Sequence, residues 1–325
     1  MSLDRTTDRF AARTCHHADF AAEELAAEKR ARGMSTSVVI PARNEAATVA
    51  EVAGVLRRTL HDRVGLLDEI LVVDADSEDG TGDLARAAGA RVVRQSDVLP
   101  GAGTALGKGE ALWKGLAASD GDVVVFVDAD IVDIGPRFVV GLLGPLLTDE
   151  RARFAKATYD RPLQVGGDLH PSGGGRVTEL LARPVIDAFW PELAWLAQPL
   201  SGEYAGDREL FESLPFVRGY GVELAMLVDI VDRFGAEVIT QVDLGRRIHD
   251  HQPLDALGRM AAEILQVAVD RLSRQGRLVL TDPLATTLLQ PVRDGDGALT
   301  MAAHDVRPQE RPPLREWREA DGAAR

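Results

Sequence analysis

The feature that most restricts the fold is a regular alternation of apolar runs and amphipathic segments between Ser37 and Asp128. The apolar runs SVVIP, EILVVD, ARVVR and DVVVFVD are rich in β-branched residues, and segments with helical periodicity separate them. Strands that are apolar at almost every position are buried on both sides, which is typical of a parallel sheet between two helical layers. The pattern predicts an α/β fold whose ligands bind beyond the carboxyl ends of the strands.

Composition excludes several classes of protein. A chain of 325 residues with 45% apolar residues can bury a large core, so general disorder is excluded. The net charge of -14 and the pI near 5.0 argue against a nucleic-acid partner. Cys15 is the only cysteine, which leaves no disulfide framework and is typical of a reducing compartment. Without a secretory signal or an apolar tract long enough for a bilayer, we expect a cytoplasmic protein that does not enter membranes.

Changes along the sequence divide the chain into four parts. Residues 1–33 are polar, with good helix formers but little apolar periodicity, and predict an exposed helix or arm. Residues 34–160 carry the strand and helix alternation, whereas residues 161–275 begin rich in loops and end in a long amphipathic helix. Residues 276–325 form a C-terminal extension, and we expect its charged tail from Arg307 onward to be flexible.

The tetrapeptide VDAD occurs twice, each time at the carboxyl end of a predicted strand. In the second copy, Asp128 and Asp130 can turn toward one point, and such hard oxygen ligands suit Mg²⁺ or Mn²⁺ shared with a diphosphate. The alternative is two solvated aspartates at a turn. Lys108, between two glycines at the start of a predicted helix, favours the functional interpretation because helix starts attract anions. The segment lacks the spacing of a P-loop, so a Walker-type NTPase is not expected.

The first copy lies in DADSEDGT, which superficially resembles a calcium-binding loop. Its glycine comes one position late and no Glu closes a loop of the required length, so calcium binding is not expected. Two interpretations remain for Asp74 and Asp76. The segment either caps the following helix through Ser77 or Asp79, or recognises a base or ribose through its carboxylates.

Three other stretches contain candidate site residues. PSGGGRVTEL (171–180) sets glycines and Arg176 before a helical run, which either binds a phosphate or carboxylate or forms a flexible linker. His249 follows a predicted strand and either completes a metal site or is structural. Glu223 either accepts hydrogen bonds from sugar hydroxyls or caps its helix.

The order of the motifs is more specific than any one of them. From Ser35 to Leu272, the motifs PARNE, VVDADSEDGT, GKGEALW, FVDAD, GGGRVTELLARP, QPLSGEYAG, GYGVE and LGRRIH resemble the actinobacterial glucosyl-3-phosphoglycerate and mannosyl-3-phosphoglycerate synthases of glycosyltransferase family 81. The resemblance implies a GT-A fold, which has a Rossmann-like, mostly parallel sheet, with a helical C-terminal extension on the acceptor side. It also implies Mg²⁺ or Mn²⁺, a nucleotide sugar donor, 3-phosphoglycerate as the acceptor, retention of anomeric configuration, and a homodimer.

The resemblance further assigns roles to residues by motif. Contacts to the donor nucleotide are implied for Pro41, Ala42, Arg43, Glu45, Asp76 or Ser77, Lys108 and Asp128. Metal binding is implied for Asp130 and His249. Contacts to the acceptor's phosphate or carboxylate are implied for Gly175, Arg176 and Thr178. The reaction centre is implied to contain Asp130, Leu200, Glu223 and Arg247, with the backbone carbonyl near Leu200 facing the anomeric carbon.

Departures from the family pattern bear on the donor. The glucosyl members carry DSD where this chain has DAD, and Asn where His251 stands. These changes favour GDP-mannose, with UDP-glucose or GDP-glucose as alternatives. Three other functions stay open from the residues alone: a HAD-type sugar-phosphoglycerate phosphatase, because FVDADIV resembles its nucleophile motif; a sugar-phosphate nucleotidyltransferase; and a sugar-nucleotide sensor without turnover.

Overall fold

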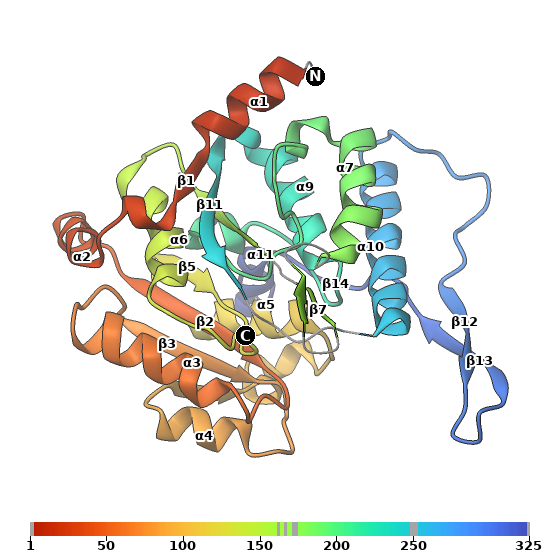
Figure 1. Cartoon of the computed structure of the whole chain (residues 1–325), viewed down its shortest axis with the longest axis horizontal. Coiled ribbons are helices and arrows are strands. Elements are labelled where there is room, and N and C mark those ends of the chain that lie inside the picture. The colour runs from red at the N-terminus through yellow and green to blue at the C-terminus, as the bar shows by residue number, and fades with distance from the viewer. Residues whose placement is uncertain (1–2, 161–162, 166–167, 171–174, 248–252, 324–325) are drawn as a thin grey trace.

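An eight-stranded sheet forms the centre of the molecule (Figure 1). The computed structural model describes residues 3–160, 163–165, 168–170, 175–247 and 253–323. The sheet has the order β1-β11-β6-β9-β5-β2-β3-β4. Its strands are β1 (Thr14–His16), β2 (Thr36–Ala42), β3 (Glu69–Asp74), β4 (Arg91–Arg94), β5 (Val123–Phe126), β6 (Phe154–Asp160), β9 (Tyr204–Asp207) and β11 (Ile239–Arg246). Only β9 is antiparallel to its neighbours, so the predicted mostly parallel sheet is confirmed.

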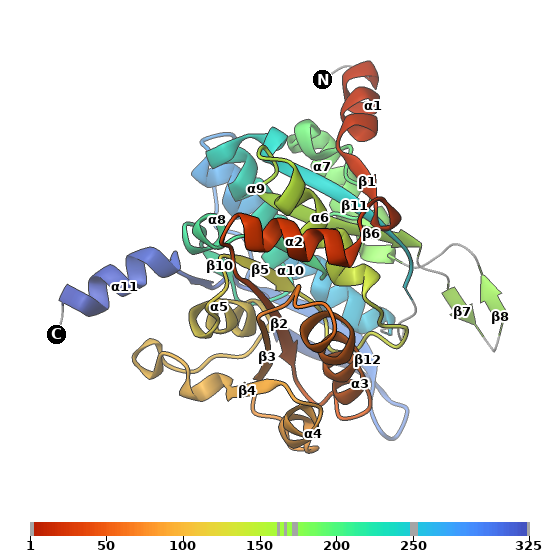
Figure 2. The same ribbon diagram turned by 90° about the vertical axis from the view of Figure 1, so that its left-hand side faces the viewer.

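Helices cover both faces of this sheet, as predicted. The helices of the described chain are α1 (Leu3–Ala12), α2 (Ala22–Ala31), α3 (Val49–Leu56), α4 (Thr81–Ala87), α5 (Lys108–Ala118), α6 (Arg137–Thr148), α7 (Arg183–Phe189), α8 (Arg208–Glu212), α9 (Val222–Phe234), α10 (Leu254–Arg274) and α11 (Leu314–Ala323), of which α1 and α11 project from the body (Figure 2). π-helical turns at Arg57–Asp62 and Thr178–Ala182 adjoin α3 and α7. Side chains of a strand alternate between its two faces. Accordingly, Val38 and Ile40 of β2 join a core with α2, α3 and α6, whereas Val39 joins a second core with α5, α9 and α10.

The N-terminal segment differs from the predicted exposed arm. β1 adds an edge strand to the central sheet by pairing in parallel with β11. In α2, Leu25 and Ala26 are buried, and the helix packs beside α6 (Figure 2). The buried Lys29 ammonium binds both carboxylate oxygens of Asp68, at 2.8 and 2.7 Å. Apolar periodicity gave no sign of this packing because the buried stripe of α2 consists of only a few side chains.

The C-terminal extension is also more ordered than predicted. β12 (Thr287–Arg293) and β13 (Leu299–Asp305) form an antiparallel hairpin that stands away from the body beyond α10 (Figure 1). The expectation of a flexible tail from Arg307 is wrong. β14 (Glu310–Arg311) pairs with β10 (Phe216–Val217), and α11 follows with Leu314 buried. The charged composition of this tail suggested disorder. The tail is ordered because Leu314 is buried and because Arg311 forms an ion pair with the buried Glu110.

The parallel strands bring three sequence motifs to one edge of the sheet. Ala42 at the end of β2 is in register with Asp74 at the end of β3, and Val39 is in register with Phe126 of β5. The PARNE segment and both VDAD copies therefore lie side by side. A short hairpin of β7 (Leu163–Val165) and β8 (Asp168–His170) follows β6. Within the described ranges, no helix combines the length and apolar character of a membrane span.

Candidate active site

A cleft of about 680 Å³ opens at the carboxyl ends of β2, β3 and β5. Its remaining walls come from the start of α5, from short segments near Arg176, Leu200 and Tyr220, and from α10. Most of the predicted site residues line it: Pro41, Ala42, Arg43, Glu45, Lys108, Asp128, Asp130, Gly175, Arg176, Thr178, Leu200, Glu223 and Arg247. Asp76 and Ser77 are not part of the lining, although their neighbour Ala75 is. His249 and His251 lie outside the described residues.

The second VDAD motif supplies two carboxylates just beyond β5. Asp128 Oδ1 lies 2.7 Å from Lys108 Nζ, and its Oδ2 lies 3.2 Å from Arg247 Nη2. Asp130 Oδ1 accepts a hydrogen bond from the same Nη2 at 2.8 Å, and 47% of the Asp130 side chain stays exposed. Burial and the charge of Asp128 raise the pKa of Asp130, against the effect of Arg247. The pair is thus fixed by cations while one carboxylate stays open to the cleft.

Two cations, the half-buried Lys108 and the buried Arg247, lie next to these carboxylates. Lys108 Nζ is also 3.2 Å from Glu223 Oε1. Burial opposes the charge of Lys108, but the carboxylates of Asp128 and Glu223 outweigh it and hold its pKa well above the ordinary value. Burial likewise opposes the charge of Arg247, whereas Glu203 and the Asp128 and Asp130 carboxylates raise its pKa. The cleft of an acidic protein therefore contains local positive charge, which a diphosphate needs.

The first VDAD motif is built into a turn. Asp74 is buried, and its Oδ1 accepts a hydrogen bond from the Ser77 backbone N–H at 2.9 Å. Ser77 Oγ accepts the N–H of Asn44 at 2.9 Å, which ties the turn to the PARNE segment. Asp76 has a positive φ of 55° and accepts the Ser96 hydroxyl at 3.0 Å. The two copies therefore have different surroundings, and the Asp74 side chain caps a turn.

Glu45 lies where the PARNE segment enters the cleft. Its backbone N–H donates to Thr81 Oγ1 at 2.8 Å, so the loop after β2 is anchored on the start of α4. Burial, together with the charges of Asp130 and Asp128, raises the pKa of Glu45 to about 7. A carboxyl group with such a pKa in a cleft is typical of a functional site.

Residues 175–178, at the end of the glycine-rich stretch before α7, form another wall of the same cleft. Gly175 has a φ of +72°, which favours glycine, and its carbonyl accepts the Glu179 N–H at 3.0 Å. Arg176 and the buried Thr178 also line the cleft. The predicted convergence of these three residues on one site is observed, at the N-terminal end of a helical segment suited to an anion.

Some residues of the site carried no recognised signal in the sequence. A Cβ added to Gly202 would lie 2.1 Å from Asp128 Oδ2 and 2.4 Å from Lys108 Nζ, so any larger residue would displace both side chains. Lys156 is buried beneath the same turn and donates to the Ser201 carbonyl at 2.6 Å. Burial lowers the pKa of Lys156 to about 7. Gly202 falls within the QPLSGEYAG motif. However, the residue types alone do not predict that Gly202 approaches Asp128 or that Lys156 binds the Ser201 carbonyl.

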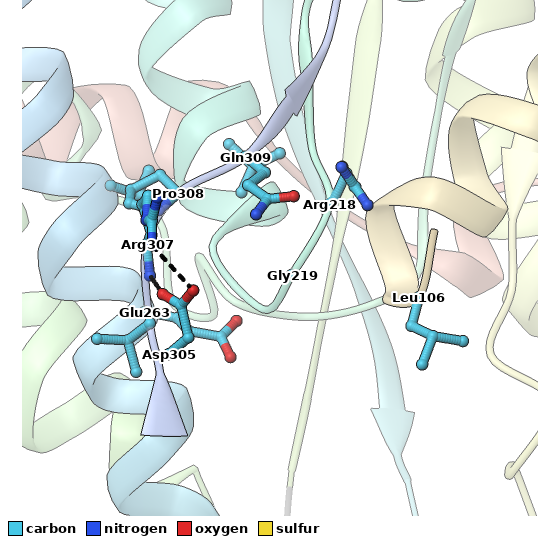
Figure 3. Close-up of a pocket in the computed structure, with 11 residues that line it drawn as sticks. Leu106, Arg218, Gly219, Glu263, Asp305, Arg307, Pro308 and Gln309 are labelled. Atoms are coloured by element: carbon cyan, nitrogen blue, oxygen red, sulfur yellow. Dashed lines mark hydrogen bonds and ion pairs between the residues drawn. The ribbon is translucent and has the colours of Figure 1, made fainter. Parts of the chain in front are cut away.

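A smaller recess of about 140 Å³ adjoins the cleft and shares Leu106, Gly219 and Glu263 with it (Figure 3). The segment from Asp305 to Gln309 forms its outer wall, and Arg307 is paired there with Asp305 at 3.3 Å. Glu263 accepts the Tyr220 N–H at 2.8 Å. The Arg218 N–H donates to the Gln309 carbonyl at 2.8 Å, so α10 and the C-terminal extension both support the loop that leads to Glu223.

Among the residues that the structure describes, no three His, Cys, Asp or Glu side chains converge as a metal site. Asp130 nevertheless fits the hard oxygen donor that Mg²⁺ or Mn²⁺ takes from a protein when a diphosphate supplies other ligands. Its exposed carboxylate in the cleft, beside Asp128, provides the negative charge that such an ion requires.

Comparison with known proteins agrees with this geometry. The family model described as glycosyl transferase family 2 matches residues 37–138, the part that contains both VDAD copies. The chain is 44% identical to glucosyl-3-phosphoglycerate synthase of Petrotoga mobilis over 308 residues, which cover 94% of each protein.

Two crystal structures are similar over nearly their whole length. The mannosyl-3-phosphoglycerate synthase of Rubrobacter xylanophilus has a TM-score of 0.88 and 40% identity, over 95% of this chain and 99% of that one. The Mycobacterium tuberculosis glucosyl-3-phosphoglycerate synthase, in complex with Mn²⁺, uridine diphosphate and phosphoglyceric acid, has a TM-score of 0.80 and 42% identity. It covers 92% of this chain and 96% of its own. With this identity, coverage and fold, the chain belongs to the family of glucosyl-3-phosphoglycerate and mannosyl-3-phosphoglycerate synthases.

Proposed function

We propose that the protein is a retaining, metal-dependent hexosyltransferase that moves a hexose from a nucleotide diphosphate sugar to 3-phosphoglycerate. One observation carries the proposal: a single cleft contains the Asp128 and Asp130 carboxylates together with the Gly175, Arg176 and Thr178 turn. A donor diphosphate and an anionic acceptor would therefore meet in one site. We assign residues 34–160 to the donor side and residues 161–275 to the acceptor side.

The metal would be Mg²⁺ or Mn²⁺, held by Asp130 and, outside the described residues, His249. When bound, such an ion stabilises negative charge on a departing diphosphate. Lys108 and Arg247 would add their positive charges at the same group. Pro41, Ala42, Arg43 and Glu45 would contact the nucleotide, with Asp76 or Ser77 nearer the base.

The acceptor would bind with its phosphate or carboxylate on Gly175, Arg176 and Thr178. Its hydroxyl would form the new bond to the anomeric carbon on the face from which the diphosphate leaves, and the hydroxyl proton would pass to the departing diphosphate oxygen. Glu223 would orient the hexose. The backbone carbonyl near Leu200 would stabilise the oxocarbenium-like centre by its dipole.

The rival functions make different demands. A HAD-type phosphatase carries its DxD motif on its first strand, whereas Asp128 follows β5, after β2, β3 and β4 in the chain. A nucleotidyltransferase would release pyrophosphate from a nucleoside triphosphate, and a sensor would bind a donor without turnover.

The donor is the finer part of the proposal. The DAD motif and His251 favour GDP-mannose, whereas the Petrotoga mobilis relative is named as a glucosyl enzyme. The test is release of nucleoside diphosphate from GDP-mannose, UDP-glucose or GDP-glucose, each with and without 3-phosphoglycerate and Mg²⁺. Acceptor-dependent release from one donor supports the proposal, and no such release from any donor refutes it.

We also propose a cytoplasmic homodimer. The outer face of the β12–β13 hairpin exposes Leu289, Leu299 and Met301, and an isolated two-stranded hairpin needs a surface to pack against. Light scattering coupled to gel filtration tests this: a mass of two chains that falls to one chain in Leu299→Asp/Met301→Asp is expected. A single-chain mass in the unmodified protein contradicts it.

A further inference from the structure

A fully buried carboxylate lies behind the cation that holds the DAD motif. Glu203 follows Gly202, which lines the cleft, but Glu203 itself has no exposed surface. Its Oε1 lies 3.2 Å from Arg247 Nη2, and its Oε2 accepts the Tyr159 hydroxyl at 2.6 Å. A buried carboxylate is costly unless it is paired and hydrogen-bonded, so its position is closely defined.

Tyr159 closes this arrangement into a triangle. Arg247 Nη1 donates to the Tyr159 oxygen at 3.2 Å, so the hydroxyl hydrogen of Tyr159 points to Glu203. Burial raises the pKa of Glu203, whereas the charge of Arg247 and the Tyr159 hydroxyl oppose that rise. The guanidinium is held by a tyrosine and a glutamate that lie outside the cleft lining.

Arg247 Nη2 faces three carboxylates from different parts of the chain. It is 2.8 Å from Asp130 Oδ1, 3.2 Å from Asp128 Oδ2 and 3.2 Å from Glu203 Oε1. A guanidinium that binds both aspartates competes with any divalent cation for their oxygens. The negative charge of Glu203 offsets that competition, because it neutralises Arg247 from behind and leaves the Asp128 and Asp130 pair with net negative charge.

We propose that Glu203, assisted by Tyr159, is a positioning residue that holds Arg247 so that Asp130 stays available to a divalent cation. The proposal rests on the proposed metal-dependent function. It does not require Glu203 to touch substrate, since its effect passes through Arg247.

The test compares Glu203→Gln with a matched variant, Asp229→Asn. Asp229 of α9 binds the buried Arg271 through two contacts of 2.8 Å, so its replacement also breaks an internal ion pair, but outside the cleft lining. Mn²⁺ binding is measured by electron paramagnetic resonance of the free ion, which needs no turnover, and the melting temperature is recorded in parallel. We expect Glu203→Gln to weaken Mn²⁺ binding by about ten- to hundred-fold, as outer-shell changes do.

We expect Asp229→Asn to melt at a lower temperature with unchanged Mn²⁺ affinity. Tyr159→Phe, which removes a single hydroxyl, should weaken Mn²⁺ binding by roughly two- to ten-fold, and it provides the test if Glu203→Gln does not fold. Glu203→Asp should recover part of the affinity. Unchanged Mn²⁺ affinity in both Glu203→Gln and Tyr159→Phe, or an equal loss in Asp229→Asn, overturns the inference. Failure of the proposed function would be a different result. In that case Mn²⁺ would bind to the unmodified protein, but no donor would give acceptor-dependent turnover.

Discussion

The ammonium group of Lys108 lies 2.7 Å from Asp128 Oδ1, and a Cβ added to Gly202 would overlap both side chains. Lys108 begins α5, Asp128 follows β5, and Gly202 precedes β9. Three segments far apart in the sequence therefore define the floor of the cleft. Its geometry depends on how closely these segments approach one another.

Gly202→Ala should abolish most activity without unfolding the protein. The added Cβ would lie 2.1 Å from Asp128 Oδ2, so the carboxylate and Lys108 must move. Displacement of catalytic groups by about 1 Å costs roughly a hundred-fold in rate, and we expect a loss of that size in kcat/KM. Gly101→Ala is the control, because its Cβ would meet no atom within 4 Å. Equal activity of both variants would contradict this view of the cleft floor.

The two VDAD copies should differ in their response to neutral substitutions. Asp130→Asn should lower Mn²⁺-dependent kcat/KM by about a hundred-fold or more, because it removes a charge that would face the ion and the diphosphate. Asp76→Asn keeps a residue that tolerates positive φ, and should affect mainly the KM for the donor. Steady-state kinetics over a Mn²⁺ series distinguishes them. A similar shift in the Mn²⁺ requirement of both variants would refute separate roles.

Arg176→Ala should raise the KM for 3-phosphoglycerate more than the KM for the donor. A hydrogen bond between charged groups contributes about 1.5–3 kcal/mol, which corresponds to roughly a ten- to hundred-fold rise. Arg176→Lys should retain part of the affinity, since the charge remains but the planar fork is lost. The two KM values, each measured at saturation of the other substrate, provide the test. If only the KM for the donor rose, the acceptor would have to bind at another part of the cleft.

Lys156 should make the free energy of unfolding rise between pH 7 and pH 10.5. Burial lowers its pKa to about 7 in the folded chain from 10.5, so the unfolded chain binds more protons in this window. The stability gained from the lowered Lys156 pKa is fully present above pH 10.5 and is lost as the pH falls to 7. Within this window the free energy of unfolding changes by at most about 1.4 kcal/mol per pH unit. Urea unfolding at pH 7, 8 and 9 should show a smaller rise for Lys156→Met. An identical rise in that variant would contradict the assignment.

Arg311→Ala should destabilise the protein although it lies in the predicted flexible tail. Arg311 forms two hydrogen bonds of 2.6 and 2.7 Å with Glu110, which has no exposed surface. Loss of Arg311 leaves the buried Glu110 carboxylate with the more distant Arg218, at 3.9 Å, so we expect a cost of about 3 kcal/mol, at the low end for a broken buried pair. Arg307→Ala, which breaks an exposed pair with Asp305, should cost less than about 1 kcal/mol. Chemical denaturation measures both, and equal stability of the two variants would mean that the tail is not held by this pair.

Local sequence predicted the parts of the fold that depend on periodicity. The apolar runs that became β2, β3 and β5 are buried on both sides, and parallel pairing places their carboxyl ends at one edge. The approximate position of the site follows from that rule alone. The ordered tail and β1 could not be foreseen, because each is held by a few contacts to segments distant in the sequence.

The sequence by itself determined the parallel strands β2, β3 and β5 and the edge at which the cleft opens, and its family resemblance named 13 of the 26 residues that line the cleft. Tertiary structure decided which carboxylate faces which cation: Asp128 is bound by Lys108 and Arg247, whereas Asp74, in an identical tetrapeptide, caps a turn. It also decided that Glu203 and Lys156 are buried beside the cleft. The reason is physical. Periodicity reports whether a side chain is buried, but the charge that it meets there depends on residues brought together from remote parts of the chain.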